Sequence, residues 1–295
     1  MKVYGRRLRL SPEEEQIIYL HRGITKEYNE SIGVVHPKIP KYLIIDIETL
    51  PCTVFVWGLY KQRIPHDNIV TDWCVLSWRA KWLYEEEVYG DVLTSQEAVV
   101  QDDRRVLEGM WKMLEEAEVV IAHNAKRFDI RKLNARFWHH KMKPPTPYQI
   151  IDTLKESQKV LGTTSHRLDY LGKYMVNRGK MDTDFELWIR CFRGEQEALD
   201  YMYEYNKEDV VLLEEIYLEL MPWIRPHPNY AIYAESTVPC CAYCGHTELD
   251  EAGVYMTQAN RYITKRCRKC GGIMRERHSD LTKIERDSLH ISIAR

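Results

Sequence analysis

The chain has 295 residues, with 42 Lys and Arg against 44 Asp and Glu and a formal net charge of −2 at pH 7. This length suits one large and one small domain, and the near-neutral charge neither favours nor excludes a nucleic-acid partner. No apolar run approaches the ~20 residues that span a bilayer, and the amino-terminal segment has no signal-peptide core. We therefore expect no membrane partner and a cytoplasmic location.

The predicted elements follow from hydrophobic periodicity and from the residues that start or stop helices. Ser11 before Pro12 is typical of a helix start, short apolar or β-branched runs indicate strands, and longer runs with apolar residues three and four apart indicate helices. In chain order we predict a helix from Ser11 to about Leu20, strands at Tyr42–Asp46, Thr53–Tyr60 and Trp73–Arg79, a helix at about Glu97–Ala117, a strand at Val119–Ala122, a helix at about Lys126–His140, a last strand at Gln149–Asp152 and a long helix at about Glu195–Leu220.

The order of these elements predicts the fold class. Strands that first form a meander and then alternate with helices indicate an α/β domain whose mixed sheet is flanked by helices. The prolines at 222, 226 and 228 mark a linker, after which a cysteine-rich unit begins. The expected parts are an N-terminal helical segment (1–38), the α/β domain (39–225), a small metal-binding unit (230–280) and a C-terminal tail (281–295).

Carboxylates occur at three places where an ordinary core would exclude them. Asp46 and Glu48 lie two apart at the end of an apolar strand, so they share one face. Asp129 follows the strand at Val119–Ala122, and Tyr205 and Asp209 lie four apart on one face of a helix. Buried carboxylates are costly unless they are paired or bind metal. If the four acids converge, two Mg²⁺ or Mn²⁺ ions about 4 Å apart would balance them and create a reaction site.

Three motifs carry a resemblance to a known family. Asp46-Ile47-Glu48-Thr49, His123-Asn124 with Phe128-Asp129, and Tyr205 with Asp209 resemble the exonuclease motifs of the DEDD superfamily, in its tyrosine subgroup. The arrangement is similar to the proofreading domains of family B DNA polymerases. The whole chain resembles stand-alone phage-type exonucleases, in which a Phe-Glu-Leu-Trp segment, here at 185–188, and a trailing zinc ribbon also occur.

The resemblance implies a ribonuclease H-like fold and a two-metal 3′→5′ exonuclease that acts on the 3′ ends of single-stranded DNA, in the host cytoplasm if the chain is phage-encoded. Asp46, Glu48, Asp129 and Asp209 would hold the two ions, and Tyr205 would orient the attacking water. The resemblance also implies a DNA polymerase or another replication protein as partner.

Other residues near the motifs admit two interpretations each. Thr49 and Asn124 either touch the terminal nucleotide or serve only to end a strand and cap a helix. His123 is expected to be structural, and Asp152 to be a helix cap rather than a fifth acid of the site.

Rival functions stay open at this point. One is a catalytically weak nucleic-acid-binding or proofreading subunit of a replisome, and another is an exoribonuclease, since nothing identifiable in the sequence reads a 2′-hydroxyl. An integrase or transposase of the same fold fits the motifs less well.

Two CxxC-Gly motifs predict a zinc site. Cys241 and Cys244 form the first pair and Cys267 and Cys270 the second, and four thiolates suit one structural, tetrahedral Zn²⁺. Cys240 could replace Cys241, but its wider spacing from Cys244 makes Cys241 the preferred ligand. Residues 254–257 and 261–264 could pair as the strands of a ribbon.

Basic residues gather in the same unit. From Arg261 onward the sequence has ten Lys or Arg against four Asp or Glu, an excess of +6. Cations next to aromatic side chains suit the binding of single strands. The alternative is that the ribbon only packs against the catalytic domain or a partner protein. The candidate DNA contacts are Arg261, Lys265, Arg266, Arg268 and Lys269.

Overall fold

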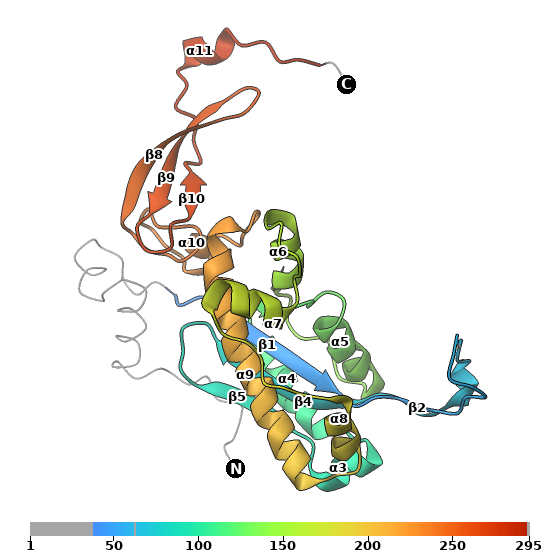
Figure 1. Ribbon diagram of the computed structural model, residues 1–295. Coiled ribbons are helices and arrows are strands. Elements are labelled where there is room, and N and C mark those ends of the chain that lie inside the picture. The colour runs from blue at the N-terminus through green and yellow to red at the C-terminus, as the bar shows by residue number, and fades with distance from the viewer. Residues whose placement is uncertain (1–37, 62, 294–295) are drawn as a thin grey trace. The chain divides into compact units, whose positions relative to one another are not determined.

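The computed structural model describes residues 38–61 and 63–293 (Figure 1), so the helix expected at Ser11–Leu20 lies outside the described residues. The chain divides into two compact units, one of which contains residues 41–217 and the other residues 218–293. Among the described residues, none of the helices combines the length and apolar character that crossing a membrane requires.

A mixed sheet organises the first unit, as predicted. In the described part of the chain it has five strands in the order β5-β4-β1-β6-β7. The central strand β1 (Tyr42–Thr49) pairs antiparallel with β4 (Val75–Trp82) and parallel with β6 (Val119–Ala122). β5 (Val88–Val92) extends the sheet beyond β4, and β7 (Gln149–Asp152) extends it beyond β6.

Helices flank this sheet (Figure 1). Trp78 on β4 is fully buried, and its indole N–H donates to the Val106 carbonyl on the amphipathic α4 over 2.7 Å, which fixes that helix against the sheet. The α-helices described in this unit are α3 (Ser95–Val100), α4 (Arg104–Glu116), α5 (Asp129–His139), α6 (Thr153–Val160), α7 (Leu168–Leu171), α8 (Phe185–Phe192) and α9 (Gln196–Leu220), with a π-helical turn, η2 (Gly172–Val176), after α7.

The single helix expected at 97–117 is two helices. Thr94 starts α3 with a capping box, and Gln101 ends it in the left-handed conformation at φ 56°. The break allows Asp103 to be buried, where its carboxylate accepts from Val75 N (2.8 Å) and pairs with Arg136 (2.7 Å). Apolar periodicity continues across such a break, so it cannot reveal one.

The prediction of a strand at 53–60 is largely wrong. Only β2 (Thr53–Val54) is extended there, and it pairs with β3 (Ile69–Thr71) outside the main sheet. The second strand of the main sheet is β4, and β5 was not predicted. β-branched and aromatic residues favour extended backbone, but composition does not show whether a sheet is available to bury them.

The second unit is a small antiparallel sheet with short helices. Its described strands are in the order β10-β9-β8. Of the predicted ribbon pair, 254–257 overlaps the end of β8 and 261–264 lies within β9, whereas β10 was not predicted. Gly245 has φ +76°, and a side chain there would collide with the Tyr230 ring. The elements are α10 (Tyr230–Tyr233), β8 (Leu249–Met256), β9 (Arg261–Cys267), β10 (Ile273–Arg275) and α11 (Lys283–Asp287), preceded by the 3-10 turn η3 (Met221–Trp223).

Candidate active site

Three of the predicted acids converge at the end of β1. One carboxylate oxygen from each of Asp46, Glu48 and Asp209 lies within 4.8 Å of the others. Period two along β1 brings Asp46 and Glu48 to one face, and α9 supplies Asp209 from the opposite end of the domain sequence. Asp209 is 1% exposed, although a lone carboxylate would prefer water.

Asp129 lies next to this group but is not one of its three members. It is the first residue of α5 and is buried, and its Oδ1 accepts a hydrogen bond from Ile47 N over 3.3 Å. Ile47 stands between Asp46 and Glu48 in the strand, so this bond ties the start of α5 to the acidic end of β1. The Oδ2 atom of Asp129 accepts no hydrogen bond from the described residues.

Burial raises the pKa of all four carboxyl groups. The pKa of Glu48 is raised to about 7 and that of Asp129 to about 8, in both cases chiefly by loss of solvation. The pKa of Asp46 lies well above its ordinary value through burial and then through repulsion from Asp209, Asp129 and Glu48, and burial likewise raises the pKa of Asp209. Buried carboxylates with unpaired oxygens and raised pKa values are the groups that a bound cation would stabilise.

A lysine that sequence analysis missed faces the acids. Lys180 Nζ forms an ion pair with Asp209 Oδ2 at 2.5 Å and lies 4.8 Å from the centre of the Tyr205 ring. Its backbone N–H donates to Asp169 Oδ1 over 3.0 Å, which helps to hold the segment in place. One ammonium cannot balance four carboxylates, so the donor set still fits hard divalent cations. Lys180 lies between regular elements, where no spacing rule marks it.

Asn206 is a second residue without an expected role. It is fully buried, its Nδ2 donates to Asp46 Oδ2, and its Oδ1 accepts from Ser77 Oγ over 3.1 Å. This chain joins α9, β1 and β4 and orients the Asp46 carboxylate. Its only sequence signal is its position next to Tyr205.

Tyr205, which was predicted to share a helix face with Asp209, lies with its ring centre 4.8 Å from Lys180 Nζ. It is 5% exposed and packs edge-to-face on Trp188, with 6.3 Å between ring centres. Burial and the charge of Asp209 raise its pKa to about 12. The phenol therefore keeps its proton near neutral pH and acts as a hydrogen-bond donor.

The remaining motif residues make contacts that hold neighbouring segments in place. Thr49 ends β1 opposite Val75. Asn124 has φ 74°, and its N–H donates to Asp152 Oδ1 over 3.1 Å. Asp152 also caps α6, which fits the expected cap role. His123 bonds Thr153 Oγ1 and the His166 carbonyl, both at 2.9 Å.

Comparison with known families agrees with the fold. The chain matches a model of the RNase_H superfamily over residues 83–221. No curated protein matches it. The matched region includes Asp129, Tyr205 and Asp209 and begins after Asp46 and Glu48. The match and the mixed sheet together support a ribonuclease H-like fold for this domain, and its acidic group is compatible with metal binding.

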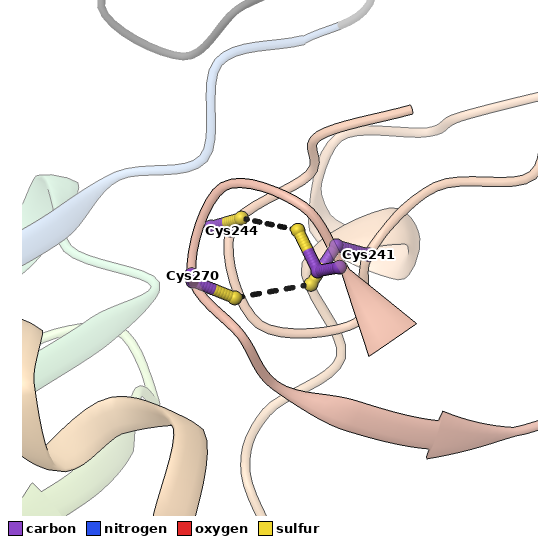
Figure 2. A group of neighbouring side chains, drawn as sticks. Cys241, Cys244 and Cys270 are labelled. Atoms are coloured by element: carbon purple, nitrogen blue, oxygen red, sulfur yellow. Dashed lines mark hydrogen bonds between the residues drawn. The ribbon is translucent and has the colours of Figure 1, made fainter. Parts of the chain in front are cut away.

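The second unit brings four cysteines together (Figure 2). One sulfur each from Cys241, Cys244, Cys267 and Cys270 lies within 4.8 Å of the others, and Cys240 is outside this group of described residues. The Cys241–Cys270 and Cys244–Cys267 sulfur distances are 3.6 and 3.7 Å. Disulfides would need about 2.05 Å, whereas four sulfurs about 2.3 Å from a tetrahedral Zn²⁺ lie about 3.8 Å apart. The cluster fits a zinc ribbon.

Three of the five candidate DNA-binding cations of the ribbon have acidic neighbours. Arg261 pairs with Asp280 at 3.0 Å and Arg268 with Asp250 at 2.7 Å. Lys265 lies 3.6 Å from Glu251 and 3.7 Å from Glu276, and Arg266 donates to the Gly271 carbonyl over 3.1 Å. These pairs offset part of the positive charge that the sequence alone indicates.

Proposed function

We propose that the protein is a 3′→5′ exonuclease that uses two Mg²⁺ or Mn²⁺ ions to hydrolyse phosphodiester bonds at the 3′ end of single-stranded DNA. The observation that carries the proposal is the convergence of Asp46, Glu48 and Asp209, with Asp129 beside them, in a ribonuclease H-like domain. So many buried carboxylates would destabilise a domain that had no cation to bind.

Each residue of the site has a role in this proposal. The four carboxylates hold the two ions, which when bound offset the acids and stabilise charge on the reacting phosphate. Asn206 keeps Asp46 in its ligand orientation through the Ser77 hydrogen bond. Tyr205 donates its O–H to the attacking water and positions it for attack on the phosphorus, while the acids nearby favour removal of the water's proton.

The ribbon completes the proposal. Cys241, Cys244, Cys267 and Cys270 hold one structural Zn²⁺, since all four positions of a tetrahedral ion are filled by protein. The basic face of the ribbon contacts the DNA strand away from the scissile bond. A cytoplasmic setting, with a DNA polymerase or another replication protein as partner, belongs to the same proposal.

The test is a cleavage assay on 5′-labelled substrates. The protein is incubated with Mg²⁺ or Mn²⁺ and single-stranded DNA, duplex DNA or RNA of one sequence, with Asp129→Ala as the inactive control. A 3′→5′ exonuclease yields a ladder of shortening labelled products, fastest on single-stranded DNA. Immediate release of a labelled mononucleotide, cleavage of circular DNA, or binding without cleavage would contradict the proposal, and faster cleavage of RNA would make the enzyme an exoribonuclease.

A further inference from the structure

A small protrusion follows β1, the strand that contains Asp46 and Glu48. Residues 53–61 and 63–71, which contain β2 and β3, extend beyond the end of β1 and away from the main sheet (Figure 1). We call this segment the aromatic finger, because Trp57, Tyr60 and Phe55 are 102%, 88% and 75% exposed. Contiguous exposed apolar groups on a soluble protein usually mark a binding surface.

The base of the finger is well anchored. Phe55 N donates to the Asn68 carbonyl over 2.9 Å, and Asn68 Nδ2 donates back to the Phe55 carbonyl over 3.0 Å. Where the chain returns to the sheet, the Trp73 ring packs under the Lys132 ammonium of α5 at 3.5 Å. The exposed rings are therefore presented by a hydrogen-bonded hairpin rather than by an unstructured loop.

The finger begins next to the acidic site. Phe55 is the seventh residue after Glu48, so their Cα atoms are at most about 25 Å apart even in an extended chain. A strand whose 3′-terminal phosphate lies at Glu48 can thus have the nucleotides on its 5′ side beside the finger.

The charge of the finger indicates its partner. Lys61 and Arg63 are exposed and follow Tyr60 closely in the sequence, and the one acid among the described residues of the segment, Asp67, has its Oδ1 2.7 Å from His66 Nε2. Aromatic faces beside cations suit a single-stranded nucleic acid, whose bases stack while its phosphates meet the charges. Aromatic residues and arginine are also common in protein interfaces, but lysine is depleted there, so Lys61 favours the nucleic acid.

We infer that the aromatic finger binds the single-stranded DNA whose 3′ end enters the active site, with Phe55, Trp57 and Tyr60 stacking on bases and Lys61 and Arg63 contacting phosphates. The inference rests on the proposed function. It adds a subsite on the exonuclease unit itself, separate from both the metal ligands and the ribbon.

Binding can be measured apart from cleavage. Fluorescence anisotropy would follow a labelled 12-mer of thymidylate and an abasic 12-mer of equal length, with Ca²⁺ in place of Mg²⁺ and intact oligonucleotide verified afterwards. Trp57→Ala should weaken binding of the thymidylate strand about tenfold, the loss of one base–aromatic stack, and leave binding of the abasic strand unchanged. Trp57→Phe should restore most of the loss. The matched control is Trp138→Ala, which removes an 84% exposed tryptophan on α5 and should change neither affinity.

The outcomes separate the two proposals. Full affinity of Trp57→Ala for the thymidylate strand, or equal losses on both strands, would overturn stacking by the finger while leaving exonuclease activity to be judged by its own assay. Base-dependent loss in a protein that cleaves nothing would support the finger and reject the exonuclease. Unchanged DNA binding together with loss of self-association, followed by sedimentation, would assign the finger to a protein interface instead.

Discussion

Lys180 Nζ lies 2.5 Å from Asp209 Oδ2, so the site already contains one cation of its own. This positive charge lowers the pKa of Asp46, Glu48 and Asp209, against the larger rise that burial causes. Lys180 therefore keeps the ligands closer to ionisation before any metal binds, although it must move from Asp209 if a divalent ion takes the same oxygen.

Lys180→Met should move the acidic limb of the kcat/KM profile to higher pH. Without the ammonium the pKa values of the acids rise further, protons compete better with Mg²⁺, and activity is lost at a higher pH than in the unmodified protein. Lys180→Arg should restore the profile. Arg178→Met is the control, because Arg178 pairs with Glu208 and Glu215 rather than with the proposed metal ligands. An unshifted profile would make Lys180 a structural residue.

Asp129 should make the stability of the Mg²⁺-free protein depend on pH. Its pKa is raised from 3.8 to about 8, so between about pH 4 and 8 the folded state binds more protons than the unfolded state. The free energy of unfolding therefore falls as pH rises through this window. Thermal melts without Mg²⁺ should show a lower Tm at pH 8 than at pH 6, and added Mg²⁺ should raise Tm more at pH 8.

Asp129→Asn is the matched variant for that effect. It keeps the size of the side chain and removes the charge, so it should weaken the pH dependence and melt above the unmodified protein at pH 8 without Mg²⁺. Part of the dependence should remain, because the pKa of Glu48 is also raised, to about 7. If the two proteins show the same slope between pH 6 and 8, Asp129 does not carry the raised pKa.

Tyr205→Phe should lower single-turnover cleavage by roughly 100- to 10,000-fold, the typical contribution of a positioned proton-transfer group. The Mg²⁺ concentration for half-maximal rate should stay the same, since the phenol is not a proposed ligand. Tyr201→Phe, on the same helix with its hydroxyl on the Asp182 carbonyl, is the control. An undiminished rate in Tyr205→Phe would limit Tyr205 to packing on Trp188.

Cys270→Ser should abolish zinc binding, whereas Cys240→Ser should not. Elemental analysis should find about one Zn²⁺ per unmodified chain and per Cys240→Ser chain, because a four-thiolate site holds one ion. The loss should destabilise the ribbon more than the nuclease unit, since so small a unit has little core to replace the metal. If Cys240→Ser loses its zinc, Cys240 is a zinc ligand in place of Cys241.

Spacing along the sequence predicted the pairs of site residues that share one face of a strand or a helix. Asp46 and Glu48 share a face because strand side chains alternate, and Tyr205 and Asp209 because a helix repeats after about four residues. Lys180 and Asn206 reach the acids only through tertiary packing, from positions with no distinguishing pattern. The same limit explains the error at residues 53–60. Their composition favours a strand, but it cannot show that the main sheet offers no partner strand to Phe55 and Trp57, which are exposed.

The ribbon's ion pairs make its proposed DNA contact testable residue by residue. Arg266→Ala should lower the slope of log K against log salt by about 0.7 for a single strand. Arg268→Ala should lower it less, because Asp250 at 2.7 Å already offsets that charge.

Asp250→Asn should therefore strengthen DNA binding and steepen its salt dependence, since it releases Arg268 to meet a phosphate. Asp91→Asn is the matched control, because it removes the same charge from an exposed arginine pair, with Arg105 at 2.6 Å, in the nuclease unit. If only Asp250→Asn gains affinity for DNA, the DNA strand contacts the ribbon. Equal gains in both variants would reflect net charge alone, and no gain in either would favour a protein partner as the ribbon's ligand.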